Sequence, residues 1–185
     1  MYDKIELKSP LTKDVVASLR AGDMVYLSGV VYTARDAAHQ RLCEDLEKGI
    51  PMPFDFEGAV VYYAGPCPAK PGKPIGSVGP TTAGRMDKFS PRLIAEGLRY
   101  MIGKGLRNNE VIESMIEHQG VFFAAIGGAA ALMAKCVEVS EVIAYPDLGP
   151  EAIRRLVVSD LPLIVAIDSE GTNYYEMGRN TYKMC

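Results

Sequence analysis

The chain has 185 residues, of which 48% are hydrophobic and 23% charged, and its formal net charge is −3. A chain of this size buries about 70% of its unfolded surface, so its core needs neither a metal nor a disulfide for stability. The mildly acidic balance argues against a nucleic-acid partner and against an anionic membrane surface. We therefore expect one domain over residues 1–185.

The sequence predicts neither a targeting segment nor a metal site. The N-terminal residues lack the cationic and apolar regions of a signal peptide, and no apolar stretch is long enough to span a bilayer. The soft metal ligands are scattered without a C-x-x-C pair, at Cys43, Cys67, Cys136, Cys185, His39 and His118. This spacing fits neither a zinc site nor an iron–sulfur cluster held by this chain alone. We expect a cytoplasmic protein with free thiols.

The first third of the chain is rich in predicted strands. Residues 5–7 are expected to form a short strand, and residues 11–19 a short helix with Thr12 as its N-cap. Residues 23–33 are rich in β-branched and aromatic side chains. Gly29 interrupts this segment, which favours two short strands separated by a bend or bulge.

A helix is predicted over residues 35–48, because apolar residues recur every four positions, at Ala38, Leu42 and Leu46. Its first turn holds Arg35 and Asp36, and His39 follows one turn later. The helix dipole favours an aspartate at this end but not an arginine. Arg35 is therefore either a solvated surface residue or a ligand-binding residue.

The next segment is predicted to contain a strand and an ordered loop. Residues 59–63 form a continuous apolar run that is typical of a buried central strand. Prolines and glycines dominate residues 64–74, which indicates an ordered loop. Cys67 is interpreted as a packing residue, because no histidine is near it in sequence to activate its thiol. Residues 71–78 are expected to end in a short strand.

Residues 79–87, Gly-Pro-Thr-Thr-Ala-Gly-Arg-Met-Asp, gather glycines, hydroxyls and an arginine in one connection. Ser90 and Pro91 follow as the predicted N-cap and first residue of a helix. Backbone N–H groups and a cation beside a helix start can bind an anion. A tight turn that is capped by its threonines is the alternative interpretation.

The helix that Pro91 opens is predicted to extend to residue 102 and to run into Gly103-Lys104-Gly105. Lys104 either neutralises the C-terminal end of this helix or is carried into a ligand site by the flexible glycines. A further helix is expected from Asn108 or Asn109 to residue 117.

The last third alternates predicted strands and helices. Strands are expected at residues 121–126, 137–145 and 163–167, and helices at residues 129–135 and 150–157. The Gly127-Gly128 turn is interpreted as close packing of a helix on the sheet, since a full phosphate-binding motif is absent. The alternation predicts a layered α/β sandwich, and the β-rich first third indicates a mixed sheet.

Seven segments together carry a more specific signal than any one of them. Four lie in the first half, at residues 27–29, 32–39, 63–68 and 79–87, and three in the second, at residues 103–105, 127–132 and 147–152. This set resembles the β-subunit of iron–sulfur hydro-lyases, the family of class I fumarases and L-tartrate dehydratases. The resemblance covers nearly the whole chain, and residues 79–87 are its most specific part.

The resemblance implies an α/β fold of the swivelling β/β/α type, with a mixed sheet and flanking helices, like the mobile domain of aconitase. It also implies a separate α-subunit that binds a [4Fe–4S] cluster through three cysteines and leaves one iron open to substrate. Family members with fused subunits are much longer, so this chain resembles the split form. The implied partners are this α-subunit and a dicarboxylate substrate, and a homo-oligomer of the heterodimer is a further option.

By the same resemblance, Arg35, Arg85 and Lys104 bind the substrate and Thr81 is the catalytic base. These residue types suit the hydration of fumarate, because its two carboxylates and its more negative transition state require cations. A threonine hydroxyl is a weak base at neutral pH. Thr81 therefore either acts with its alkoxide stabilised by nearby cations or only positions the substrate.

Three supporting residues complete the predicted site. Thr82 donates a hydrogen bond or holds the turn, and Asp36 and His39 orient Arg35, although His39 is alternatively a proton relay or a packing or surface residue. Fumarate hydratase is the preferred function, while L-tartrate dehydratase and mesaconate hydratase present the same paired carboxylates. The rival functions are a non-enzymatic dicarboxylate-binding module and a self-sufficient hydratase, and the cysteine spacing argues against the latter.

Overall fold

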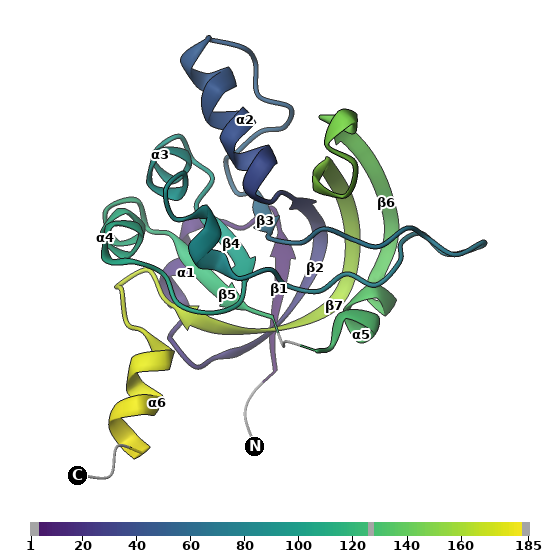
Figure 1. Cartoon of the computed structure of the whole chain (residues 1–185). Helices are drawn as coiled ribbons and strands as arrows, with labels where there is room; N and C mark the ends of the chain where they lie inside the picture. Colours follow the sequence, from purple (N-terminus) through teal and green to yellow (C-terminus); the bar gives the residue numbers. More distant parts are fainter. Residues whose placement is uncertain (1–3, 126–127, 183–185) are drawn as a thin grey trace.

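A computed structural model describes residues 4–125 and 128–182 as a single sheet with helices around it (Figure 1). The described strands are β1 (Ile5–Ser9), β2 (Met24–Thr33), β3 (Val60–Tyr62), β4 (Tyr100–Gly103), β5 (Val121–Ala124), β6 (Val137–Ala144) and β7 (Ile153–Ile167). The α-helices are α1 (Lys13–Ser18), α2 (Asp36–Glu47), α3 (Ser90–Ala95), α4 (Asn109–His118), α5 (Ala130–Lys135) and α6 (Tyr174–Tyr182). Two 3₁₀ turns, η1 (Ala83–Met86) and η2 (Pro146–Glu151), complete the fold.

The sheet closes on itself because its long strand β7 pairs on both edges. The strand order is β1-β2-β3-β4-β5-β7-β6, and β7 also pairs with β2. The pairs β2–β3, β3–β4 and β4–β5 are parallel, whereas β7 is antiparallel to β2, β5 and β6. The predicted mixed sheet is confirmed, but the sheet curls into a barrel rather than forming a flat layer of a sandwich.

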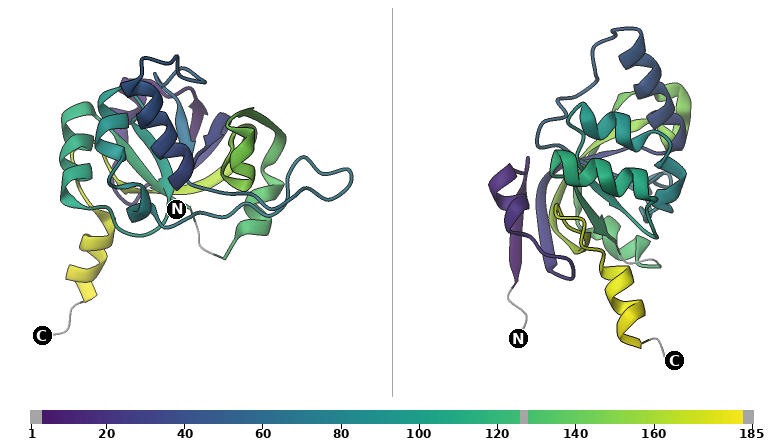
Figure 2. Two further views of the ribbon diagram at one scale, coloured as in Figure 1. Left: turned by 45° about the horizontal axis from the view of Figure 1, so that its top comes forward. Right: turned by 90° about the vertical axis from the view of Figure 1, so that its left-hand side faces the viewer.

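Successive side chains of a strand point to opposite faces of the sheet, so the core consists of two clusters. Val60 and Tyr62 of β3 belong to a cluster with inward-facing residues of β2, β4, β5 and β7, which fills the closed sheet. Val61 and Tyr63 point the other way and pack against α2, α3 and α4. These three helices cover one outer side of the barrel (Figures 1 and 2). Burial of each large apolar side chain contributes about 1.5–3 kcal/mol.

Two predicted helices are wrong, and in both cases a strand takes their place. The helix predicted over residues 91–102 ends at Ala95, because Gly97 adopts a φ of 111° and redirects the chain into β4. The helix predicted over residues 150–157 is the end of η2 and the start of β7. Short apolar runs fit a buried strand as well as a helix, and pairing with neighbouring strands decides between them.

Three smaller predictions need correction. Ser90 is the first residue of α3 rather than its N-cap, which is Phe89, and its hydroxyl donates to the carbonyl of Met86. Residues 71–78 contain no strand, and the N–H of Val78 instead donates to the carbonyl of Ala130. Residues 24–33 form one strand, β2, rather than the two strands predicted. The expected irregularity does occur, as a register shift beside Gly29.

The predicted caps of two helices are confirmed. Thr12 accepts a hydrogen bond from the N–H of Val15, and Asn108 accepts one from the N–H of Val111. The turn predicted at Gly127-Gly128 lies partly outside the described residues, since Gly127 is not among them. None of the described helices has the length and apolar character needed to cross a membrane.

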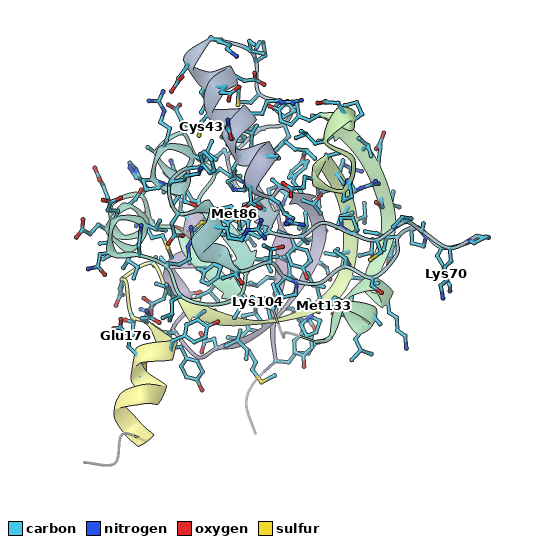
Figure 3. All side chains as sticks on the ribbon, viewed as in Figure 1. Cys43, Lys70, Met86, Lys104, Met133 and Glu176 are labelled. Atoms are coloured by element: carbon cyan, nitrogen blue, oxygen red, sulfur yellow. The ribbon has the colours of Figure 1, made fainter. Side chains whose placement is uncertain are left out.

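Two segments extend away from the barrel. Helix α6 points outward at the C-terminal end of the chain (Figure 2). The loop that follows β3 also projects, and Figure 3 labels Lys70 near its tip.

Candidate active site

The parallel strands bring several predicted site residues to one edge of the sheet. Arg35 follows β2, Gly65 follows β3 and Lys104 directly follows β4. Carboxyl ends of adjacent parallel strands lie side by side, and ligands of α/β proteins bind outside this edge. The three strands are therefore the scaffold on which the candidate site is built.

Residues 81–83 are inserted between the ends of β3 and β4. The N–H of Thr81 donates to the carbonyl of Tyr63 at 2.6 Å, and the carbonyl of Thr81 accepts from the N–H of Lys104 at 3.3 Å. Thr82 pairs with Lys104 as a parallel bridge, and the N–H of Ala83 donates to the carbonyl of Lys104 at 2.8 Å. This pairing fixes the backbone of both threonines beside Lys104, whose side chain is exposed (Figure 3).

A buried ion pair anchors the far end of the same segment. Arg107 is fully buried, and its Nε donates to Oδ1 of Asp87 at 2.7 Å. The other carboxylate oxygen of Asp87 accepts from the N–H of Asn108, and Arg107 also donates to the hydroxyl of Ser90. The guanidinium carbon of Arg107 lies 5.4 Å from the ring centroid of Tyr63. Arg107 was not predicted from the sequence, although the acidic last residue of the motif, Asp87, indicates that a cationic partner is needed.

Arg85 and Arg35 meet at one carboxylate. Nε of Arg85 donates to Oδ1 of Asp36 at 2.8 Å, and Nη2 of Arg35 lies 3.7 Å from Oδ2 of Asp36. The side chain of Arg85 is 52% exposed and that of Arg35 is 21% exposed. Two guanidinium groups therefore flank Asp36, and the more exposed one is free to exchange its partner for a ligand.

Glu151 adds a second carboxylate beside the same guanidinium nitrogen of Arg35. Oε1 of Glu151 lies 3.3 Å from Nη2 of Arg35, and Oε2 accepts a hydrogen bond from the N–H of Ala37 at 2.9 Å. A Cβ atom at Gly65 would lie 2.9 Å from Nη1 of Arg35, so a glycine is what lets the guanidinium lie against this loop. Glu151 was not predicted as a site residue, although it lies within residues 147–152, one of the segments on which the family resemblance rests.

His39 is buried directly behind Arg35. Its Nδ1–H donates to the carbonyl of Arg35 at 2.9 Å, and its ring packs edge-on against Tyr63 with a centroid separation of 5.1 Å. Burial, the largest cause, lowers the pKa of His39 to about 4. The imidazole is therefore neutral near pH 7, and the idea of a surface histidine is wrong.

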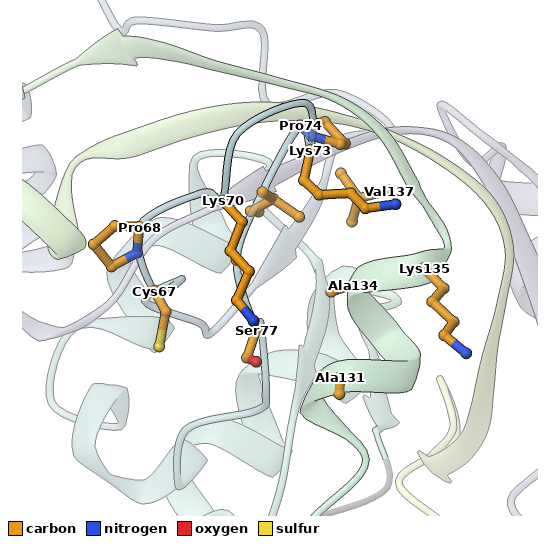
Figure 4. Close-up of a pocket in the computed structure, with 12 residues that line it drawn as sticks. Cys67, Pro68, Lys70, Lys73, Pro74, Ser77, Ala131, Ala134, Lys135 and Val137 are labelled. Carbon is orange, nitrogen blue, oxygen red and sulfur yellow. The ribbon is translucent and has the colours of Figure 1, made fainter.

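A cavity of about 440 Å³ lies beside the site rather than in it. It opens between the projecting loop and α5, and Figure 4 shows Lys70, Lys73 and Lys135 around it. None of the predicted substrate-binding residues lines this cavity. At the strand ends, Arg85 and Lys104 are exposed.

No part of the described chain offers the ligands of a metal or cluster. Across residues 4–125 and 128–182, no group of three or more His, Cys, Asp or Glu side chains could hold a metal ion. The described cysteines, Cys43, Cys67 and Cys136, are free thiols, and Cys185 lies outside the described residues. Cys67 is exposed, so the interpretation of this residue as a packing residue is wrong. These residues therefore do not fit an iron–sulfur cluster.

Comparisons with known proteins point to one reaction class. The family model for the fumarase C-terminus matches residues 1–178. A candidate L(+)-tartrate dehydratase β-subunit of Methanocaldococcus jannaschii is 40% identical over 172 residues, which cover 90% of this chain and 88% of that protein. The anaerobic class I fumarate hydratase of Escherichia coli is 35% identical over 178 residues, covering 94% of this chain and 32% of that enzyme.

Fumarate hydratase 2 of Leishmania major is also 35% identical, over 176 residues that cover 93% of this chain and 31% of that enzyme. The chain therefore spans about a third of the length of the fumarate hydratases that it matches. It matches the candidate tartrate dehydratase β-subunit of Methanocaldococcus jannaschii over most of the length of both proteins.

Proposed function

We propose, because the chain belongs to the fumarase C-terminus family, that it is the β-subunit of an iron–sulfur-dependent hydro-lyase. The preferred reaction is the reversible hydration of fumarate to L-malate. The observation that carries this proposal is the meeting of Arg35 and Arg85 at the strand edge, beside the paired Thr81 and Lys104 segments. The relatives are named as hydro-lyases, which supports the same reaction class.

The cations of the chain would bind the two carboxylates of the substrate. Arg35 and Arg85 carry planar guanidinium groups that suit two parallel hydrogen bonds to a carboxylate, and Lys104 adds a point charge. Negative charge grows on one carboxylate as the neighbouring carbon loses its proton, so cations that are fixed beforehand lower the barrier. Arg85 would share or leave Asp36 on binding, because its Nε already donates to that carboxylate.

Thr81 would present its hydroxyl to the substrate from a rigid turn. Hydrogen bonds to Tyr63 and Lys104 hold its backbone on both sides. As a base it would remove the proton from the substrate, with nearby cations stabilising its alkoxide. As a positioning residue it would only donate a hydrogen bond, and Thr82 would maintain the turn in either case.

The cluster would belong to a separate α-subunit in the cytoplasm. The chain has the length of a relative that is named as a subunit, and its described residues contain no set of cluster ligands. When bound, a cluster with an open iron supplies a Lewis acid for the hydroxyl group that is added or removed. A homo-oligomer of the heterodimer remains a further prediction.

The substrate is the least constrained part of the proposal. Fumarate, L-tartrate and mesaconate all present paired carboxylates to Arg35, Arg85 and Lys104. The relatives divide between fumarate and tartrate in their names. Walls contributed by the α-subunit would then select among the acids.

Co-expression with a cluster-bearing α-subunit and an assay on the three acids would test the proposal. We expect Thr81→Ala and Arg85→Ala each to lower kcat/KM by about a hundredfold, because each removes a group that acts on developing charge. Arg92→Ala is a matched control, since Arg92 is an exposed arginine that pairs with Glu96 at the end of α3. Near-normal turnover in both site variants would contradict the site, and dicarboxylate binding without activity in the wild-type complex would favour the binding module.

A further inference from the structure

Glu151 joins the start of α2 to Arg35 through both of its carboxylate oxygens. One oxygen lies 3.3 Å from Nη2 of Arg35, and the other accepts the N–H of Ala37 at 2.9 Å. We propose that Glu151 is a positioning residue that orients Arg35 for the substrate carboxylate. This role rests on the proposed function of Arg35 and extends it to a residue 114 positions beyond Ala37.

Arg35 needs such a partner because of where it stands. It is the N-cap residue of α2, and its side chain makes no capping hydrogen bond. The positive end of a helix repels a guanidinium and leaves N–H groups unpaired. Glu151 compensates for both effects, since it accepts the N–H of Ala37 and places a negative charge beside Arg35.

Asp36 does not replace Glu151 in this role. Its Oδ1 already accepts from Arg85 at 2.8 Å, and its Oδ2 lies 3.7 Å from Nη2 of Arg35, farther than the 3.3 Å of Oε1 of Glu151. The charges alternate in the order Glu151, Arg35, Asp36, Arg85. When substrate draws Arg85 away from Asp36, Glu151 still holds Arg35.

The element that carries Glu151 is itself fixed against α2. Nη1 of Arg41 donates to Oδ1 of Asp147 at 2.8 Å, and the hydroxyl of Tyr145 donates to Oδ2 of Asp45 at 2.7 Å. These contacts hold the start of η2 to the exposed side of α2 over successive turns. Glu151 therefore reaches Arg35 from a braced segment, which a positioning role requires.

The isosteric variant Glu151→Gln separates this role from simple packing. Its amide oxygen can still accept the N–H of Ala37, while its amide nitrogen removes the negative charge beside Arg35. In the complex with the α-subunit we expect KM for the dicarboxylate to rise about tenfold with kcat changed less than about threefold. Glu151→Asp, which keeps the charge on a shorter side chain, should recover part of the loss.

Glu96→Gln is the matched control, because it makes the same change in a carboxylate that pairs with Arg92 at the end of α3 and that the proposed site does not include. Its KM should equal that of the wild type. An unchanged KM in Glu151→Gln, or an equal rise in both variants, would overturn the proposal. An inactive wild-type complex would instead count against the proposed function.

A second readout does not depend on turnover. In the full chain without a partner, the Nε–H signal of Arg35 in a nitrogen–proton NMR spectrum reports the surroundings of its guanidinium. We expect Glu151→Gln to shift this signal and Glu96→Gln to leave it in place. Identical Arg35 signals in all three proteins would refute the positioning role even if no substrate is turned over.

Discussion

Two arginine–aspartate pairs involve the same segment, through Arg85 and Asp87, but they lie in different surroundings. Arg107 and Asp87 are 2.7 Å apart and nearly withdrawn from water, with side-chain exposures of 0% and 10%. Arg85 and Asp36 are 2.8 Å apart, but their side chains are 52% and 29% exposed. The distance alone therefore says little about what each pair does.

The difference lies in what else each arginine contacts. Arg107 donates to Asp87, Ser90 and Tyr63. Arg85 donates to Asp36 through Nε and lies on the open side of η1. A buried pair with such partners holds a fold together, whereas an exposed pair with one contact can open for a ligand at little cost.

Replacing each arginine by methionine tests this difference, and we expect the larger loss of stability in the buried pair. Arg107→Met would leave the Asp87 carboxylate without its cation, and we expect the free energy of unfolding to fall by about 3–5 kcal/mol. Arg85→Met should change it by less than about 1 kcal/mol. Denaturant unfolding of both variants measures the two values, and equal values would show that the distinction is mistaken.

The buried side of the site should also respond to acid. His39 has a pKa of about 4 in the folded chain, against 6.5 for the ordinary side chain. The unfolded chain therefore binds a proton first as pH falls, so stability is full above pH 6.5 and is lost between pH 6.5 and 4. This loss amounts to about 3 kcal/mol.

His39→Phe keeps a ring against Tyr63 and removes the titrating group. The difference in unfolding free energy between wild type and variant, measured by denaturant at several pH values, should shrink by that amount as pH falls from 7 to 4. A difference that stays constant with pH would mean that His39 is not held neutral by burial. Groups that titrate equally in both proteins cancel from this comparison.

The same contrast shows what could be predicted from the sequence. Local signals worked where a residue's partner is near in the chain, as for the caps Thr12 and Asn108. They failed for β4 and for the start of β7, because a short apolar run becomes a strand only when neighbouring strands accept it. Closure of the sheet through β7 is a property of topology that no local pattern contains.

In the candidate site, too, the residues named from the sequence differ from the partners that only the fold brings to them. Residue types and the family resemblance singled out Arg35, Thr81, Arg85 and Lys104, and the fold places them at or next to one sheet edge. Their roles stay predictions. The residues that hold them were missed because they come from distant segments: Glu151 pairs with Arg35, and Arg107 lies 20 positions after Asp87. Charge complementarity has no fixed spacing, so only the fold identifies these partners.

The smallest expected effect concerns the open side alone. Gly65→Ala would place a methyl group 2.9 Å from Nη1 of Arg35, at the far end of a side chain that can move, and 3.2 Å from the backbone carbonyl oxygen of Pro150, which must shift by a few tenths of an ångström. We expect the free energy of unfolding to change by less than about 1 kcal/mol, while KM for the dicarboxylate rises about tenfold through misplacement of the guanidinium. Gly178→Ala on α6 adds the same methyl group to open space and serves as the control. If Gly65→Ala lowered stability and left KM unchanged, Arg35 would be a structural residue like Arg107. The proposal that Arg35 binds the substrate would then be wrong.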